Sequence, residues 1–375
     1  MLSKGDDYPI HQTPEPIAYA GTDRNFYDRY FFNGYAPDGA DFFAVAFGVY
    51  PHLNIADAHF AVVRDGVQYN LHASCFLGME RMKLEVGPIR IVVEEPLQRL
   101  RLIVQGSHGF AADLLFQGRA FPIEEPRFIY RVGPRSLMDY TRLTQNGRYV
   151  GWIELDGKRK ELPQGSMGTR DRSWGVRPIG ERDSQPHVPA MEPGFLWQWC
   201  PLNFAEKSVF YHIKATGQGH VWNTRAAIVR DDGGAADIIE TTDAAMAVEF
   251  GRGTRHARSG VLTINAPSHP TLRIAFEPVV RFQMSGIGYQ NPEWGHGSYH
   301  GELTVARDQY RLDEVDVNDP LFLHIQAFSR LTLTQDGRAP EHGIGVFEQL
   351  ILGYKPLGLA NIADTSGMFA GEDQG

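Results

Sequence analysis

Short stretches in which apolar and polar residues alternate dominate the sequence. In residues 43–49, 89–93 and 100–104, large apolar side chains recur at every second position. A period of two is that of a β-strand with one buried face. Helical periodicity is scarce, and its best candidate, residues 237–250, is short, rich in Ala and could equally form a pair of strands. The pattern predicts an all-β protein.

Glycine and proline separate these stretches. The sequence contains 40 Gly and 23 Pro, spread along its whole length. Asn-Gly or Asp-Gly pairs occur at residues 33–34, 38–39, 65–66, 146–147, 156–157, 232–233 and 336–337. Such pairs favour the type I′ turns that connect antiparallel strands. Many short strands joined by tight turns predict antiparallel sheets that close as barrels or sandwiches.

The length of 375 residues fits either two domains or one large all-β unit, at about 150 residues per domain. Proline interrupts any strand between residues 181 and 193 and supplies an extended connection there. We therefore expect an N-terminal β domain over residues 1–185, a C-terminal β domain over residues 186–362 and a flexible tail over residues 363–375.

Composition narrows the classes of function. The 36 Lys and Arg against 45 Asp and Glu give a net charge of −9, which disfavours nucleic acids and anionic membrane surfaces as partners. No GxGxxG follows a predicted strand and no Walker motif occurs, so a nucleotide cofactor is not expected. Two cysteines without zinc-type spacing fit a reducing cytoplasm. The N-terminal residues lack an apolar region, and no apolar run of about 18 residues occurs, so we expect neither export nor a membrane span.

The most distinctive segment, residues 168–177, contains three arginines, one carboxylate and an indole. On an extended strand, Asp171 faces one way while Arg170, Arg172 and Trp174 face the other. A carboxyl group beside aromatic walls inside a barrel has its charged form disfavoured and can serve as a proton donor. The alternative is a structural pair between Asp171 and an arginine.

Two further segments carry aromatic or polar side chains at alternate positions. Trp197 and Trp199 share one strand face, and Tyr211 follows on the next predicted strand. They are candidates for the wall of a ligand cavity, or for ordinary core packing. His324 and Gln326 also share one face, and Glu348 lies on the last predicted strand. These three polar residues are further candidates. A ligand site or an internal hydrogen-bond network would satisfy them equally.

Residues 291–302 are rich in acid, base and aromatic groups, with Glu293 and His296 as candidates for proton transfer. His296 and His300 have the spacing of two metal ligands on a helix, but the glycines between and after them argue against a helix. On a strand the two side chains would be about 13 Å apart. We therefore expect no metal site in this segment and assign no metal ligands.

The Asp171-x-x-Trp174-Gly175 box, followed by Trp197-x-Trp199 and a turn at residues 231–233, resembles the AttH/carotenoid 1,2-hydratase-like group. These proteins have tandem lipocalin-like (calycin) domains, and certain Diels-Alderases and a plant-phytoalexin hydratase are among them. The resemblance implies two β-barrels, an apolar cavity near their contact and chemistry without an organic cofactor. Arg172 stands where carotenoid hydratases carry His, and no Tyr-x-Asp pair follows Trp199, so carotenoid hydration itself is not implied.

We therefore expect a cofactor-independent lyase or isomerase, with hydratase-like acid–base chemistry on an apolar or aromatic small molecule. The expected catalytic residues are Asp171, Glu293, His296 and His324. The expected substrate-binding residues are Arg170, Arg172, Trp174, Trp197, Trp199, Tyr211, Gln326 and Glu348. The alternative is a non-catalytic carrier of a hydrophobic ligand, and carbohydrate processing is a third class. A homodimer is left open by the sequence.

Overall fold

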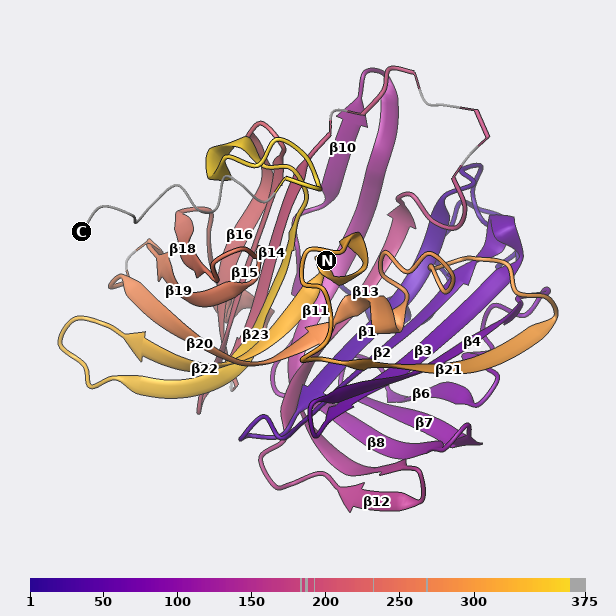
Figure 1. Cartoon of the computed structure of the whole chain (residues 1–375), viewed down its shortest axis with the longest axis horizontal. Coiled ribbons are helices and arrows are strands. Elements are labelled where there is room, and N and C mark those ends of the chain that lie inside the picture. Colours follow the sequence, from indigo (N-terminus) through magenta and orange to yellow (C-terminus); the bar gives the residue numbers. More distant parts are fainter. Residues whose placement is uncertain (183, 186–187, 192, 232, 268, 365–375) are drawn as a thin grey trace. The chain divides into compact units, whose positions relative to one another are not determined.

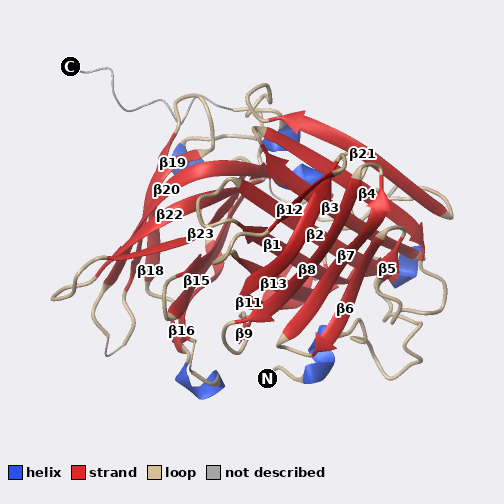
Figure 2. Ribbon diagram, turned by 90° about the horizontal axis from the view of Figure 1, so that it is seen from below, coloured by secondary structure: helices blue, strands red, loops and turns tan. Residues whose placement is uncertain are grey.

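The computed structural model describes residues 1–364 except 183, 186–187, 192, 232 and 268, and residues 365–375 of the expected tail lie outside this part. Strands make up most of the described chain, as predicted (Figure 2). Residues 237–250 follow the strand alternative, as β17 (Ile239–Thr241) and β18 (Ala244–Phe250). In the described residues, no helix has the length and apolar character needed to cross a membrane.

The chain divides into two compact units. Unit 1 consists of Met1–Ala190 and Gly286–Arg311, and unit 2 of Met191–Ser285 and Leu312–Gly375. The chain first passes from unit 1 to unit 2 between Ala190 and Met191. The segment Gly286–Arg311 was expected in the C-terminal domain, but it belongs to unit 1, because its strand pairs with a strand of that unit.

Unit 1 is built on one antiparallel sheet. Its strands are β1 (Phe26–Tyr35), β2 (Asp41–Tyr50), β3 (Ile55–Arg64), β4 (Val67–Phe76), β5 (Glu85–Val86), β6 (Ile89–Glu95), β7 (Arg99–Ser107), β8 (Phe110–Gly118), β9 (Ile123–Glu124), β10 (Phe128–Val132), β11 (Arg135–Leu155), β12 (Lys158–Glu161), β13 (Met167–Val176) and β21 (Leu303–Arg311). They follow the order β21-β4-β3-β2-β1-β13-β11-β8-β7-β6-β5, and β9, β10 and β12 pair with β11. Strands β1–β8 and β11 contribute side chains to one apolar core, so the sheet curls around it.

Unit 2 is built on a second antiparallel sheet. Its strands are β14 (Phe195–Asn203), β15 (Lys207–Thr216), β16 (Val221–Arg230), β17, β18, β19 (Ala257–Ile264), β20 (Leu272–Gln283), β22 (Ile325–Thr334) and β23 (Glu341–Ile351). Their order is β17-β16-β15-β14-β23-β22-β20-β19-β18. This sheet also curls around its own apolar core, from Cys200 of β14 to Phe347 of β23. The two curled sheets confirm the tandem lipocalin-like fold.

Helices are limited to short 3₁₀ turns in the described residues. They are η1 (Lys4–Asp7), η2 (Pro51–Leu53), η3 (Ala235–Asp237), η4 (Met284–Ile287), η5 (Pro320–Phe322) and η6 (Lys355–Leu357). The remaining chain between the strands consists of turns and loops. Figure 1 shows β21 running beside β4, where it covers an edge that would otherwise expose unpaired backbone groups.

The Asn-Gly and Asp-Gly pairs have two different roles. Asp65-Gly66 joins β3 to β4 and Asp156-Gly157 joins β11 to β12, with positive φ at both residues as type I′ turns require. Asn33-Gly34 lies inside β1, so the turn predicted there is wrong. A Cβ atom on Gly34 would lie 2.2 Å from the ring of Phe43, so this glycine makes room for an aromatic side chain.

Candidate functional site

Strand alternation gives the sheet of unit 1 two different faces. Ala58 and Phe60 of β3 point into the apolar core, so Asp57 and His59 of the same strand point to the opposite face. These two side chains are buried all the same, with 2% and 1% of their surface exposed. We call this second face the polar face of unit 1.

Asp171 also points to the polar face. It pairs with Phe31 of β1 and Thr144 of β11, and it interacts electrostatically with Arg29 and Arg142. Asp171 is buried. The prediction that Asp171 and its two neighbouring arginines point to opposite faces of the strand is confirmed. Asp171, however, lies on the face of the sheet that points away from the apolar core, not inside the barrel.

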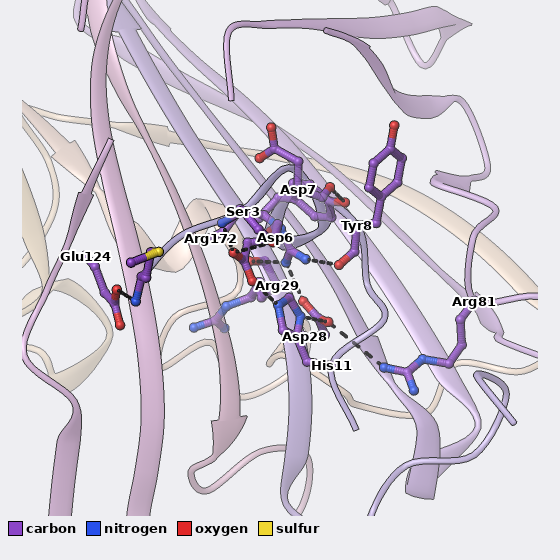
Figure 3. A network of polar contacts seen from close by, with 12 residues as sticks. Ser3, Asp6, Asp7, Tyr8, His11, Asp28, Arg29, Arg81, Glu124 and Arg172 are labelled. Atoms are coloured by element: carbon purple, nitrogen blue, oxygen red, sulfur yellow. Dashed lines mark hydrogen bonds and ion pairs between the residues drawn. The ribbon is translucent and has the colours of Figure 1, made fainter. Parts of the chain in front are cut away.

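Arg170 and Arg172 extend from the core side of β13 to the N-terminal segment, which we define as residues 3–12. Figure 3 shows Arg172 among the residues of this segment. Arg170 forms an ion pair with Asp7, and Arg172 forms one with Asp28. Arg172 also donates to the carbonyl oxygen of Tyr8 at 2.8 Å. Both guanidinium groups are fully buried and paired within the protein. Their contacts are structural, and we leave both arginines out of the proposed site.

Trp174 has a similar role at the same place. The ring of His11 stacks on its indole with centroids 3.7 Å apart. Nδ1 of His11 lies 2.8 Å from Asp28 (Figure 3). The histidine is therefore held between this aspartate and the indole. The substrate contact expected for Trp174 is therefore replaced by a contact with the N-terminal segment.

The clearest polar group in unit 2 surrounds Glu348. Its carboxylate accepts hydrogen bonds from Trp197 Nε1 at 2.6 Å, His324 Nε2 at 2.9 Å and Gln326 Nε2 at 2.6 Å. We call these four residues the Glu348 network. Burial alone would raise the pKa of Glu348, but the hydrogen bonds from His324, Gln326 and Trp197 hold it below its usual value. Four residues chosen from sequence therefore come together.

The aromatic residues chosen beside them divide between the two faces of the unit 2 sheet. Trp199 pairs directly with Glu348, on the face opposite the core. Tyr211 lies inside the apolar core next to Cys200 and Phe347. The positions of Trp197 and Trp199 are thus compatible with the wall of a ligand site, whereas Tyr211 fills the core.

His296 lies in unit 1, in the loop before β21, and meets Asp57 and His59 at the polar face. Burial, with a smaller contribution from the charge of Arg29, lowers the pKa of His296 to about 3. The ring of Tyr289 packs edge-on against it with centroids 4.8 Å apart. We call Asp57, His59 and His296 the histidine cluster.

The two other candidates of this loop lie elsewhere. Glu293 is exposed, so the burial that would prepare it for proton transfer is missing. His300 stacks on Trp294 with centroids 3.9 Å apart, and its Nε2 lies 3.1 Å from the carbonyl oxygen of Glu293. His300 therefore does not join His296 at the histidine cluster.

Sequence reasoning missed Asp57 and His59. Both are polar residues at alternate positions of a strand whose other positions are Ala56, Ala58 and Phe60. The same alternation singled out His324 and Gln326, so the signal was present. What no pattern along the sequence could supply is the contact with His296, which comes from a loop far along the chain.

A shallow hollow of about 340 Å³ lies on unit 1, lined by residues that include Tyr8, Met82 and Arg90. None of its lining residues belongs to the Glu348 network or to the histidine cluster. The hollow is therefore not connected to the chemistry of either group.

Comparison with solved structures finds the same fold at low sequence identity. CghA in complex with Sch210972 is 11% identical, with a TM-score of 0.50 over 92% of this chain and 95% of that chain. An AttH protein from Nitrosomonas europaea is 12% identical, with a TM-score of 0.49 over 92% and 98%. Kievitone hydratase from Nectria haematococca is 12% identical, with a TM-score of 0.44 over 86% and 88%. The likeness to CghA supports the fold that the sequence resemblance implied.

Comparison of sequences gives the family. A search of the curated proteins finds no match. A family model described as "Family of unknown function (DUF8625)" matches residues 2–360. The match covers nearly the whole chain, including both units, and the protein therefore belongs to this family of unknown function.

Proposed function

We propose that the protein is a lyase or isomerase that uses acid–base chemistry, without an organic cofactor, on an apolar or aromatic small molecule. The observation that carries the proposal is the Glu348 network, in which a buried carboxylate orients His324 beside an indole. Histidine is the side chain most often used to move a proton near neutral pH, and a carboxylate partner fixes its orientation.

His324 is the proposed proton carrier. Because Glu348 binds the Nε2 proton, the proton exchanged with substrate is the one on Nδ1. In a hydration, Nδ1 gives its proton to one carbon of a polarised double bond, water forms a C–O bond at the other carbon, and the extra proton of that water returns to Nδ1. The reverse is dehydration, and removal of a proton from a different carbon is isomerisation. One placed acid or base contributes about 10²–10⁴-fold in rate.

The surroundings of the network support an apolar or aromatic substrate. Trp197 and Trp199 lie on the same sheet face as Glu348, and indole rings favour flat or apolar ligands. CghA, a protein of the same fold, has been solved with Sch210972. Asp171 stays a predicted second acid or base, on the polar face of unit 1.

The test is turnover of a panel of flavonoid and terpenoid alkenes and the corresponding alcohols in ²H₂O. Mass spectrometry detects the gain or loss of one water and the deuterium that acid–base chemistry places on carbon. We expect His324→Gln and Glu348→Gln to lower kcat by at least ~10²-fold on any probe that reacts. His342→Gln, on an exposed residue of the same strand as Glu348, is the matched control.

Two results would contradict the proposal. Parental turnover in both variants removes the Glu348 network from the mechanism. Binding of a probe without any turnover, with the same Kd in the parent and in both variants, identifies a carrier of hydrophobic ligands instead.

A further inference from the structure

The histidine cluster brings three atoms of the kind that bind metals close together, without hydrogen bonds between them. Oδ1 of Asp57 lies 3.9 Å from Nε2 of His59 and 3.7 Å from Nδ1 of His296. Both separations are too long for hydrogen bonds. The ligand atoms of the three residues all lie within 4.8 Å of one another. Among the residues that the structure describes, no other group of three His, Cys, Asp or Glu side chains comes as close.

The two imidazole nitrogens that face Asp57 have no hydrogen-bond partner. Nε2 of His59 and both ring nitrogens of His296 are unsatisfied, although the two side chains are more than nine-tenths buried. Buried polar atoms without partners are rare in folded proteins, because each costs free energy. The nitrogens therefore require a group that the protein itself does not supply.

The spacing of the three atoms suits a metal ion. Bonds of about 2.0–2.2 Å from zinc to nitrogen and oxygen, at tetrahedral angles, place neighbouring ligand atoms roughly 3.4 Å apart. The two observed separations from Asp57 exceed this by only a few tenths of an ångström. Small side-chain rotations would close the site around an ion.

A relay behind His59 is of the kind that supports metal-binding histidines. Nδ1 of His59 lies 2.9 Å from Nδ1 of His72. Nε2 of His72 lies 3.4 Å from Oδ2 of Asp308, an electrostatic contact without hydrogen-bond geometry. If each ring donates one proton toward Asp308, Nε2 of His59 is left as a lone-pair donor facing Asp57. Carboxylate partners of this kind fix the tautomer and orientation of a ligating imidazole.

The carboxylate of Asp57 and the space beside it are also held in place. Its Oδ2 accepts the backbone N–H of Gly297 at 2.7 Å, and its Oδ1 accepts the hydroxyl of Tyr50 at 3.1 Å. A Cβ atom on Gly288 would lie 3.0 Å from Nδ1 of His296 and 3.0 Å from Nε2 of His59. Glycine at this position, where φ is +92°, keeps a side chain away from both nitrogens.

We propose that Asp57, His59 and His296 bind a divalent transition-metal ion of the zinc type. Two imidazoles and one carboxylate are borderline ligands that suit zinc, cobalt or iron better than calcium or magnesium. Three protein ligands leave at least one position for water or another oxygen ligand. The charge of Arg29, near Tyr289 on the same face, opposes a cation, and the carboxylate of Asp171, which interacts with Arg29, offsets part of that charge.

The test uses the full-length protein, stripped of metal with a chelator and then titrated with Co²⁺ alone. Bound Co²⁺ shows visible absorption that reports nitrogen and oxygen ligands in a site of low coordination number, and calorimetry gives the stoichiometry. We expect one ion per chain and a rise in Tm when Co²⁺ or Zn²⁺ is added. Binding should weaken by at least ~10-fold in His296→Gln and in Asp57→Asn.

The matched control is His300→Gln, which changes a histidine of the same loop that is not a ligand and should leave Co²⁺ affinity unchanged. Circular dichroism and Tm establish that each variant is folded. The wild-type titration decides the matter even if a variant does not fold, because failure to bind one Co²⁺ per chain overturns the proposal. Equal affinity in a folded His296→Gln variant would also overturn it.

Discussion

Glu348 illustrates how a buried charge is stabilised by single contacts. Three neutral or cationic donors surround its carboxylate, and the free-energy cost of burial is offset by these hydrogen bonds. The network also ties β23 to β14 and β22 through side chains. These hydrogen bonds favour the charged form of Glu348 in the folded protein, so folding and the protonation of Glu348 are linked.

The linkage predicts how stability depends on pH. The folded pKa of Glu348 lies below its unfolded value, so its contribution is present above about pH 4.5 and is lost as the pH falls through the folded pKa. Glu348→Gln should lower the free energy of unfolding at pH 7 by about 1–3 kcal/mol. The difference from wild type should shrink toward pH 3, as measured by urea unfolding.

Glu277→Gln is the control, because Glu277 is 72% exposed and its nearest cation, on Arg330, is 3.7 Å away. It should change stability by less than about 0.5 kcal/mol at any pH. A difference between wild type and Glu348→Gln that stays constant with pH would show that Glu348 is not charged in the folded protein.

At the scale of elements, the N-terminal segment stabilises β13 through one buried ion pair and through hydrogen bonds from Arg172 to its carbonyl oxygens. Asp7 pairs with Arg170, and the carbonyl oxygen of Asp7 accepts the hydroxyl of Tyr30. The Asp171-x-x-Trp174-Gly175 box thus combines two functions on one strand. Arg170, Arg172 and Trp174 hold the N-terminal segment, while Asp171 faces the polar side.

Asp7→Asn should destabilise the protein by about 3–5 kcal/mol, because it leaves the buried guanidinium of Arg170 without its counter-ion. Thermal or urea unfolding measures this loss. Lys4→Gln changes an exposed residue of the same 3₁₀ turn and should have little effect. Equal stability of the two variants would mean that the ion pair does not anchor the segment.

The sequence predicts this level of structure only in part. The alternation at Asp171 correctly assigns the faces of β13, because strand geometry fixes which neighbours share a face. The ion-pair partners of Arg170 and Arg172 are Asp7 and Asp28, which lie far away along the sequence. A local pattern contains no information on such pairings, and for the same reason it could not join Asp57 and His59 to His296.

At the scale of the whole molecule, unit 1 depends on a segment from the second half of the sequence. β21 pairs with β4 from Leu303↔Cys75 to Arg311↔Val67, and the loop before it brings His296 to Asp57. The all-β architecture was predictable from strand periodicity, whereas the length left the number of domains open and the expectation of two came from the proline-rich segment and the family resemblance. The pairing of β21 with a strand of unit 1 was not predictable, because the alternation of residues in β21 resembles that of any other strand.

Residues 1–190 produced alone should therefore aggregate, since β4 is left as an unpaired edge. Adding a synthetic peptide of residues 286–311 should restore a soluble species, as measured by size-exclusion chromatography with light scattering. A peptide of the same composition in scrambled order is the control. A soluble monomer of residues 1–190 without any peptide would show that β21 is dispensable for unit 1.

The place of β21 in the sequence also sets the order of events during synthesis. A ribosome releases the strands of unit 1 first, but the last of them emerges only after most of unit 2 has been made. Domains usually fold one after another as they are translated. Here β4 of unit 1 stays unpaired on one side until β21 has been translated. The two units therefore complete their folding at almost the same time.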